Sequence, residues 1–302
     1  MSTFFKTVVT PLDGSELAEL VLPHLPNIAP PNGVTVALAQ VIEPGRYALG
    51  GLDFSVPTLL DILREGAREY LARQAESLHA RGYRVTTHVL VGDPAFAILD
   101  LAEELHADLI AMTTHGRTGF MRLALGSVAE RILQKASAPV LLVRERMDPA
   151  RTTIKRILAP LDGSVLAEQA LSPAQSLAHA HGATLILLRV SPILDEGGKQ
   201  ILFADEAAAN AQIEQWRVDA ETYLHELAAG LNRAGIPIET RVALGNPADV
   251  IYNTIDDAAV DVVVMGTHGR TGLKRWYFGS VADRVLRGAK CPVLMVRNLK
   301  TE

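Results

Sequence analysis

The sequence predicts an α/β protein built from two tandem domains, each an open, mostly five-stranded parallel sheet with helices on both faces. Three observations predict this fold. The chain has 302 residues, a length typical of about two domains. Short apolar runs alternate with longer amphipathic stretches, as they do in parallel α/β sheets. Four motifs recur in the same order in the two halves of the chain.

The repeated motifs define two copies of one domain. Pro-Leu-Asp-Gly-Ser occurs at residues 11–15 and 160–164, and Thr-His-Gly-Arg-Thr-Gly occurs at 114–119 and 267–272. Gly-Ser-Val-Ala and Pro-Val-Leu follow in both halves. Two unrelated domains that merely share a fold would not keep identical loop residues. We therefore predict domains at residues 1–146 and 151–300, joined by a short charged linker.

The apolar runs give the predicted strands. In copy one they are residues 6–10, 35–41, 84–91, 109–113 and 140–143. In copy two they are residues 156–159, 184–190, 238–243, 262–265 and 293–296. Long helices are predicted at 59–80 and 212–234. Asp93-Pro94 and Asn246-Pro247 each place a capping residue before a proline, which favours a helix start over a ligand contact.

Composition excludes several classes of function. Lys and Arg number 29 against 34 Asp and Glu, so no basic footprint for nucleic acid is present. Cys291 is the only cysteine, so no intrachain disulfide can form, which fits a reducing compartment. No secretory signal and no apolar run long enough to span a bilayer are visible. We expect a cytoplasmic protein with neither nucleic-acid nor membrane partners.

Ligands of open parallel sheets bind beyond the carboxyl ends of the strands, where the strand order reverses. The residues after the first and fourth strands are therefore the candidates, and they are the residues that repeat. Asp13 and Asp162 follow the first strand of each copy. Their carboxylates would accept hydrogen bonds from ribose hydroxyls or would support a helix start, and the sequence leaves both readings open. Ser15 and Ser164 are expected to cap the next helix.

A glycine-containing loop follows the fourth strand and ends where the last helix begins. Glycines let the backbone approach a ligand closely. Amide groups at the helix start would point at an anion, and the helix dipole adds to that attraction. The alternative is a tight loop with a capping serine, but duplication of the loop favours the anion site. The helix-start residues are Gly126, Ser127 and Val128 in copy one, and Gly279, Ser280 and Val281 in copy two.

The spacing Gly-x2-Gly-x9-Gly-Ser, preceded by an aspartate after the first strand, resembles the ATP-binding signature of the universal stress protein family. Copy two matches it at Gly266, Gly269, Gly279 and Ser280, with Asp162 upstream. The resemblance covers residues 1–143 and 154–297. It implies the Rossmann-like, adenine nucleotide alpha hydrolase-like fold, and ATP with Mg²⁺ as the bound ligand. It also implies adenine binding through the backbone at Val41 and Val190.

Copy one departs from the signature at one position. Thr113 replaces the first glycine, while Gly116, Gly126 and Ser127 remain. A β-branched residue is costly at positive φ and brings bulk near the phosphates. We therefore expect copy two to be the tighter site.

Histidine and arginine also repeat within the loop. His115 and His268 have no carboxylate or nucleophile at a telling spacing, so local packing or hydrogen bonding is favoured over catalysis. Arg117 and Arg270 would neutralise phosphate charge or lie in solvent, and the first reading is favoured. We include His268, Arg117 and Arg270 among the expected nucleotide-binding residues.

Three classes of function remain. The chain is an ATP-binding stress or signalling module read by a protein partner, a slow ATPase, or a dimerising scaffold that binds no nucleotide. Neither a P-loop nor a dinucleotide fingerprint is present, and the motifs assemble no general base. We expect nucleotide binding with at most slow hydrolysis. The family resemblance further implies an intrachain pseudo-dimer that pairs the two last strands, and it allows a homodimer.

Overall fold

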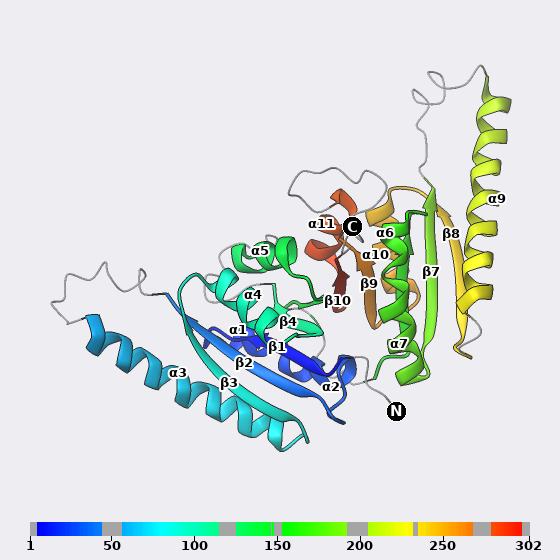
Figure 1. Ribbon diagram of the computed structural model, residues 1–302. Helices are drawn as coiled ribbons and strands as arrows, with labels where there is room; N and C mark the ends of the chain where they lie inside the picture. The colour runs from blue at the N-terminus through cyan, green and yellow to red at the C-terminus, as the bar shows by residue number, and fades with distance from the viewer. Residues whose placement is uncertain are drawn as a thin grey trace. The chain divides into compact units, whose positions relative to one another are not determined.

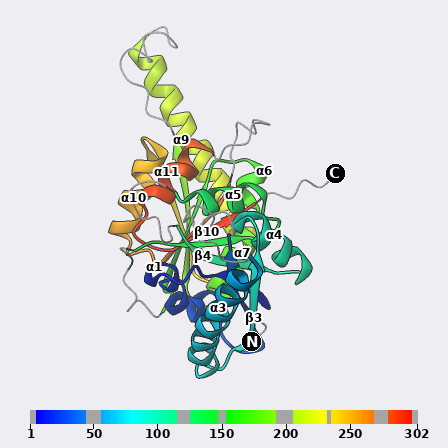
Figure 2. The same cartoon turned by 90° about the vertical axis from the view of Figure 1, so that its left-hand side faces the viewer.

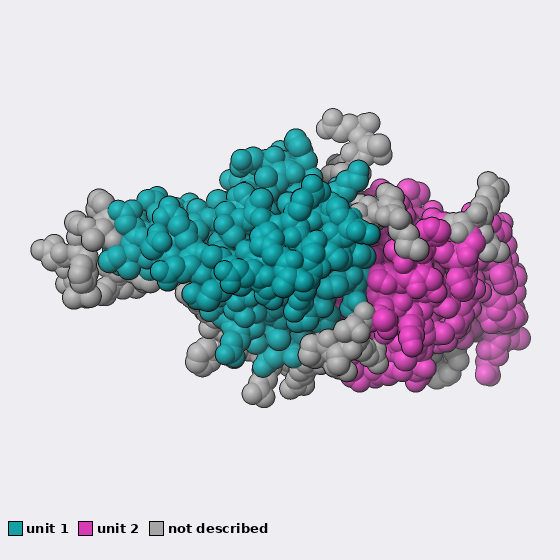
Figure 3. Space-filling model, turned by 90° about the horizontal axis from the view of Figure 1, so that it is seen from below, with its two compact units in different colours: residues 1–152, 299–302 teal, residues 153–298 magenta. Residues whose placement is uncertain are grey.

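The chain divides into two compact units, which Figure 3 colours separately. Unit 1 comprises Met1–Thr152 with Leu299–Glu302, and unit 2 comprises Thr153–Asn298. The computed structural model describes residues 5–43, 56–114, 125–145, 147, 153–191, 205–231, 235–267 and 279–297.

Unit 1 is a five-stranded parallel sheet with helices on both faces (Figure 1). Its strand order is β3-β2-β1-β4-β5. The strands are β1 (Thr7–Pro11), β2 (Thr35–Ile42), β3 (Arg84–Val91), β4 (Leu109–Thr113) and β5 (Val140–Val143). The helices are α1 (Glu16–Glu19), α2 (Leu25–Ile28), α3 (Val56–His79), α4 (Pro94–Glu104) and α5 (Ser127–Lys135), with a 3₁₀ turn at Leu22–His24.

Unit 2 repeats this arrangement in the order β8-β7-β6-β9-β10. Its strands are β6 (Arg156–Leu161), β7 (Thr184–Ser191), β8 (Ile238–Leu244), β9 (Val262–Gly266) and β10 (Val293–Val296). Its helices are α6 (Val165–Glu168), α7 (Leu171–His181), α9 (Glu206–Leu231), α10 (Pro247–Asp257) and α11 (Ser280–Gly288).

The strands form because their apolar runs are buried. Every residue of β4, β5, β9 and β10 is buried, as expected where helices cover both faces of a sheet. The long helix α3 lies along β3 and contacts β2 as well, and Figures 1 and 2 show this pairing from two sides. Fully buried side chains such as Leu38, Leu71 and Leu109 fill the space between these layers.

The predicted helix starts are confirmed. Ser15 and Ser164 cap α1 and α6 through bonds from the amides of Ala18 and Ala167. Asp93 and Asn246 cap α4 and α10, whose first helical residues are Pro94 and Pro247. None of the described helices has the length and hydropathy needed to cross a membrane.

The topology places a crevice in each unit. Strands β1, β2 and β3 proceed toward one edge of the unit 1 sheet, whereas β4 and β5 proceed toward the other. The strand order therefore reverses between β1 and β4, and in unit 2 it reverses between β6 and β9. At such a point the connections leave to opposite faces, which opens space above the carboxyl ends of the strands.

Candidate functional site

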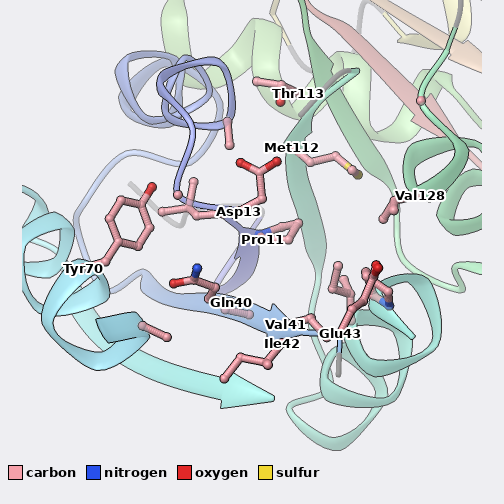
Figure 4. A pocket seen from close by; sticks show the side chains of 18 of the residues that line it. Pro11, Asp13, Gln40, Val41, Ile42, Glu43, Tyr70, Met112, Thr113 and Val128 are labelled. Atoms are coloured by element: carbon pink, nitrogen blue, oxygen red, sulfur yellow. The ribbon is translucent and has the colours of Figure 1, made fainter. Parts of the chain in front are cut away.

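Each unit has a cavity at its predicted crevice. The unit 1 cavity has a volume of about 400 Å³ and lies over the ends of β1, β2 and β4. Figure 4 shows Asp13 projecting into it, with Gln40 and Tyr70 to one side and Val128 to the other. The unit 2 cavity has a volume of about 240 Å³ and lies over the ends of β6, β7 and β9.

The structure brings most of the predicted site residues together at these two cavities. Unit 1 contributes Asp13, Val41, Gly126, Ser127 and Val128 to the lining of its cavity. Unit 2 contributes Asp162, Val190, Gly266, Gly279, Ser280 and Val281. Gly116, Arg117, His268, Gly269 and Arg270 lie outside the described residues.

The two aspartates are held by the serine that follows them. Ser15 donates to Asp13 Oδ1 from its amide at 2.9 Å and from its hydroxyl at 2.5 Å. Ser164 makes the same two bonds to Asp162 Oδ1, at 3.0 and 2.6 Å. The glycine between them adopts a φ of about +80° in both units, a conformation that a side chain would disfavour. The turn therefore fixes each carboxylate at the floor of its cavity.

The helices that begin at the cavities differ from the other capped helices. Gly126 and Gly279 occupy the cap positions of α5 and α11, and neither helix receives a side-chain cap. The first intrahelical bonds recorded there run from Glu130 to Gly126 and from Asp283 to Gly279. The amides at Ser127, Val128, Ser280 and Val281 precede those donors, so they are the groups that a helix leaves for an external acceptor. Ser127 and Ser280, which would have been the cap residues in the alternative interpretation of this loop, are instead the first helical residues.

The backbone at the end of β2 also faces the crevice. Strand β1 pairs with β2 only as far as Ala39, whose carbonyl accepts from the amide of Leu12. Strand β2 continues to Ile42 beside β3. Residues two apart in a strand direct their amide and carbonyl to the same side. Val41 lies two residues after Ala39, which bonds to β1, so its amide and carbonyl point to the β1 side, beyond the last bond between the two strands. The end of β2 thereby offers one donor and one acceptor at the cavity.

The structure corrects one reason given for the difference between the copies. Thr113 and Gly266 are the last residues of β4 and β9, and each lines its cavity. Neither has a positive φ; the described non-glycine residues with positive φ are His106 and Ala259. The expectation that Thr113 is strained at positive φ is therefore wrong, because the chain is still extended at this position. At this position, the two units differ in the bulk of the threonine side chain.

Two residues at the unit 1 cavity, and the unit 2 counterpart of one of them, were not predicted from the sequence. Gln40 and Tyr70 line the unit 1 cavity. At the position of Gln40, unit 2 has Arg189, whose guanidinium lies over the ring of Tyr223. Gln40 and Arg189 differ between the two copies, so the repeat of motifs does not point to them. The tyrosines do recur, each followed by a fully buried leucine, and this is the signal that would have found them.

The described residues hold no cluster of three or more His, Cys, Asp or Glu side chains that would bind a metal ion. Among the described residues that line the unit 2 cavity, Asp162 is the only carboxylate. A divalent cation at the unit 2 cavity would therefore depend on oxygens of a bound ligand for most of its coordination, as Mg²⁺ commonly does with phosphates.

Comparisons with known proteins agree with the repeat and the fold. The chain is 34% identical over 141 residues to a universal stress protein of Methanocaldococcus jannaschii, covering 47% of this chain and 83% of that protein. It is 28% identical over 249 residues to one from Mycolicibacterium smegmatis, covering 80% of each. A crystal structure of a universal stress protein from Archaeoglobus fulgidus has the same fold, with a TM-score of 0.73 at 23% identity, covering 99% of this chain and 98% of that one.

The sequence model of the universal stress protein family matches residues 4–144 and 153–297, which are the two halves that the motifs repeat. The chain therefore belongs to the universal stress protein family and carries two tandem domains of that family.

Proposed function

We propose that each unit binds an adenine nucleotide, ATP together with Mg²⁺, and that the protein acts as a nucleotide-dependent stress or signalling module. One observation carries the proposal. A carboxylate, a strand end with open backbone groups and an uncapped helix start meet at one cavity, and they do so in both units. These three features match the three chemical parts of a nucleotide.

The phosphates would lie at the start of α5 or α11. The amides of Ser127 and Ser280 begin these helices, and a glycine precedes each. A glycine cap leaves room for an anion and supplies no competing oxygen. Each helix has nine residues, long enough for its dipole to favour negative charge at this end.

The adenine and the ribose would use the other two features. The amide and carbonyl of Val41 offer a donor and an acceptor at the spacing of one residue, which suits the N1 and N6 edge of adenine. Val190 holds the corresponding position at the end of β7. The carboxylates of Asp13 and Asp162 would accept from ribose hydroxyls. Guanine presents an acceptor and a donor in the reverse order, so the same backbone groups would reject it.

Small molecules released by denaturing the purified protein test this proposal directly. We expect mass spectrometry to find an adenine nucleotide, and calorimetric titration of the emptied protein to show ATP binding in preference to GTP. Gly126→Val and Gly279→Val, each in the full chain, would remove one site at a time by placing a branched side chain at the helix start. Absence of any adenine nucleotide, together with no ATP binding at millimolar concentration, would favour a scaffold that binds no nucleotide.

A further inference from the structure

The unit 1 cavity extends into a space that the unit 2 cavity lacks. We call this space the side pocket; it lies between the end of β2 and the first half of α3. Its lining residues are Gln40, Ile62, Leu63, Gly66, Ala67 and Tyr70. No residue of the corresponding helix α9 lines the unit 2 cavity. The larger cavity, of about 400 Å³ against about 240 Å³ in unit 2, is thus the one that includes the side pocket.

Arg189 lies against the long helix of unit 2. It replaces Gln40, and its Cζ lies 5.1 Å from the centroid of the Tyr223 ring. A methyl group in place of a hydrogen on Gly163 would lie 2.9 Å from Cζ and from Nη2 of Arg189. The guanidinium is therefore packed between the long helix and the turn that carries Asp162. The Tyr223 hydroxyl donates to Glu168 Oε1 at 2.9 Å, which holds the ring in this position.

Gln40 gives the side pocket its polar character. Its Oε1 atom is buried and has no hydrogen-bond partner within the described part of the chain. A buried acceptor without a partner is unfavourable, so a ligand that brings an N–H or O–H group gains by satisfying it. Ile62, Leu63 and Ala67 are apolar, and none of the described residues that line the pocket is cationic. An anionic ligand group would lose its hydration there without finding a counter-ion among these residues.

We propose that the side pocket of unit 1 is a ligand subsite for an uncharged group that carries a hydrogen-bond donor, and that Arg189 closes the equivalent subsite in unit 2. The inference rests on the proposed nucleotide binding. Gln40, Tyr70 and Asp13 lie on the same side of the cavity in Figure 4, so the group that enters is one attached at the ribose. The two units then differ in ligand specificity: unit 1 accepts a ribose-modified nucleotide and unit 2 does not.

A reciprocal exchange tests the subsite. The probe is ATP esterified on a ribose hydroxyl with N-methylanthranilate, an uncharged aromatic group with one N–H donor, and unmodified ATP is the reference. Unit 1 is measured in full-length protein carrying Gly279→Val, and unit 2 in protein carrying Gly126→Val. Gln40→Arg should weaken probe binding to unit 1 at least tenfold while ATP binding stays within threefold. Arg189→Gln should strengthen probe binding to unit 2 at least tenfold.

Gln40→Ala tests the hydrogen bond from the ligand separately from the space in the side pocket. It also gives a second test of the subsite if Gln40→Arg fails to fold. It leaves the pocket open, so we expect the probe to weaken several-fold without a change for ATP. Circular dichroism confirms that each variant is folded. A ratio of probe to ATP affinity that is unchanged by both exchanges overturns the subsite while nucleotide binding stands. Failure of both units to bind ATP overturns the proposed function, and the subsite with it.

Discussion

The guanidinium of Arg189 lies over the ring of Tyr223, with 5.1 Å from Cζ to the ring centroid. The ring is held from its other end, because its hydroxyl donates to Glu168. Burial raises the pKa of Tyr223 well above its ordinary value, and the hydrogen bond to Glu168 adds to this. The phenol therefore stays protonated and keeps its donor at neutral and moderately alkaline pH.

This arrangement predicts a measurable coupling between the two residues. Arg189→Ala and Tyr223→Ala, alone and together, should give a coupling energy of about 1 kcal/mol, since the guanidinium is only partly exposed. Tyr223→Phe keeps the ring beneath Arg189 and should lose about 1 kcal/mol through the missing bond to Glu168. Both tryptophans, Trp216 and Trp276, belong to unit 2, so urea unfolding followed by tryptophan fluorescence reports this unit.

The corresponding pair in unit 1 is the control. Gln40 and Tyr70 occupy the same positions without a positive charge, so their double-mutant cycle, followed by circular dichroism, should give a smaller coupling. Additive effects of the Arg189 and Tyr223 substitutions would mean that the ring and the guanidinium are neighbours without a favourable interaction.

The strands were the most predictable part of the fold. Leu109–Thr113 and Val140–Val143 match the predicted ranges, because apolar runs between turn residues leave little freedom in where a buried strand ends. The partly exposed strand Arg84–Val91 matches its predicted range as well. The long helices begin earlier than predicted, at Val56 and Glu206. Their first turns are poor in the apolar periodicity on which the prediction relied.

The candidate site was predictable only where the two copies agree. Asp13 and Asp162 could be found because an identical turn surrounds both. The difference between Gln40 and Arg189 could not be interpreted from the sequence, because its effect depends on which side chains pack against these two residues in the folded protein. The steric penalty predicted for Thr113 assumed a positive φ, and the sequence alone does not determine the φ of this residue.

Asp93 should make the stability of unit 1 depend on pH. Burial raises the pKa of Asp93, but the hydrogen bond from Arg131 and those from the amides of Phe96 and Ala95 together bring it below its ordinary value. A depressed pKa means that the stabilisation is complete above the unfolded-state pKa and is lost as the pH falls through the folded-state value. Both side chains of the ion pair are more than a third exposed, so its contribution is at most about 1 kcal/mol.

Asn246 shows that asparagine caps the equivalent helix of unit 2. Asp93→Asn should therefore cost at most about 1 kcal/mol at pH 7, and its difference from wild type should shrink below a pH of about 4. Asp93→Ala should lose about a further 1 kcal/mol at every pH, because it removes the cap. Amide hydrogen exchange of α4, measured by mass spectrometry, checks both variants. A difference between the wild type and Asp93→Asn that is constant from pH 7 to pH 3 would contradict the ion-pair argument.

ATP turnover should be slow. Asp162 is the only titratable side chain among the described residues that line the unit 2 cavity, and its Oδ1 already accepts two bonds from Ser164. General-base catalysis requires a group free to take a proton from the attacking water. We expect phosphate release under saturating Mg-ATP to be far below the ~10 s⁻¹ typical of enzymes. Glu43 lines the unit 1 cavity, so Glu43→Gln is the matched variant. A rate near ~10 s⁻¹ that this substitution abolishes would identify unit 1 as an enzyme.

The two units should differ in affinity for ATP itself, with unit 2 the tighter. Thr113 and Gly266 are extended residues at the same position, so the expected difference rests on the bulk of the threonine side chain beside the proposed phosphate position. A steric loss of about 1.4 kcal/mol corresponds to a tenfold weaker site. Thr113→Gly should strengthen ATP binding to unit 1 by up to about that factor and leave ATP binding to unit 2 unchanged.

Gly279→Val should remove most high-affinity ATP binding, because it blocks the start of α11. Calorimetric titration of the wild type and of these two variants separates the contributions. Equal affinity at both wild-type sites would show that the larger unit 1 cavity accommodates the phosphates in spite of Thr113. Normal ATP binding by Gly279→Val would show that the phosphates do not lie at this helix start.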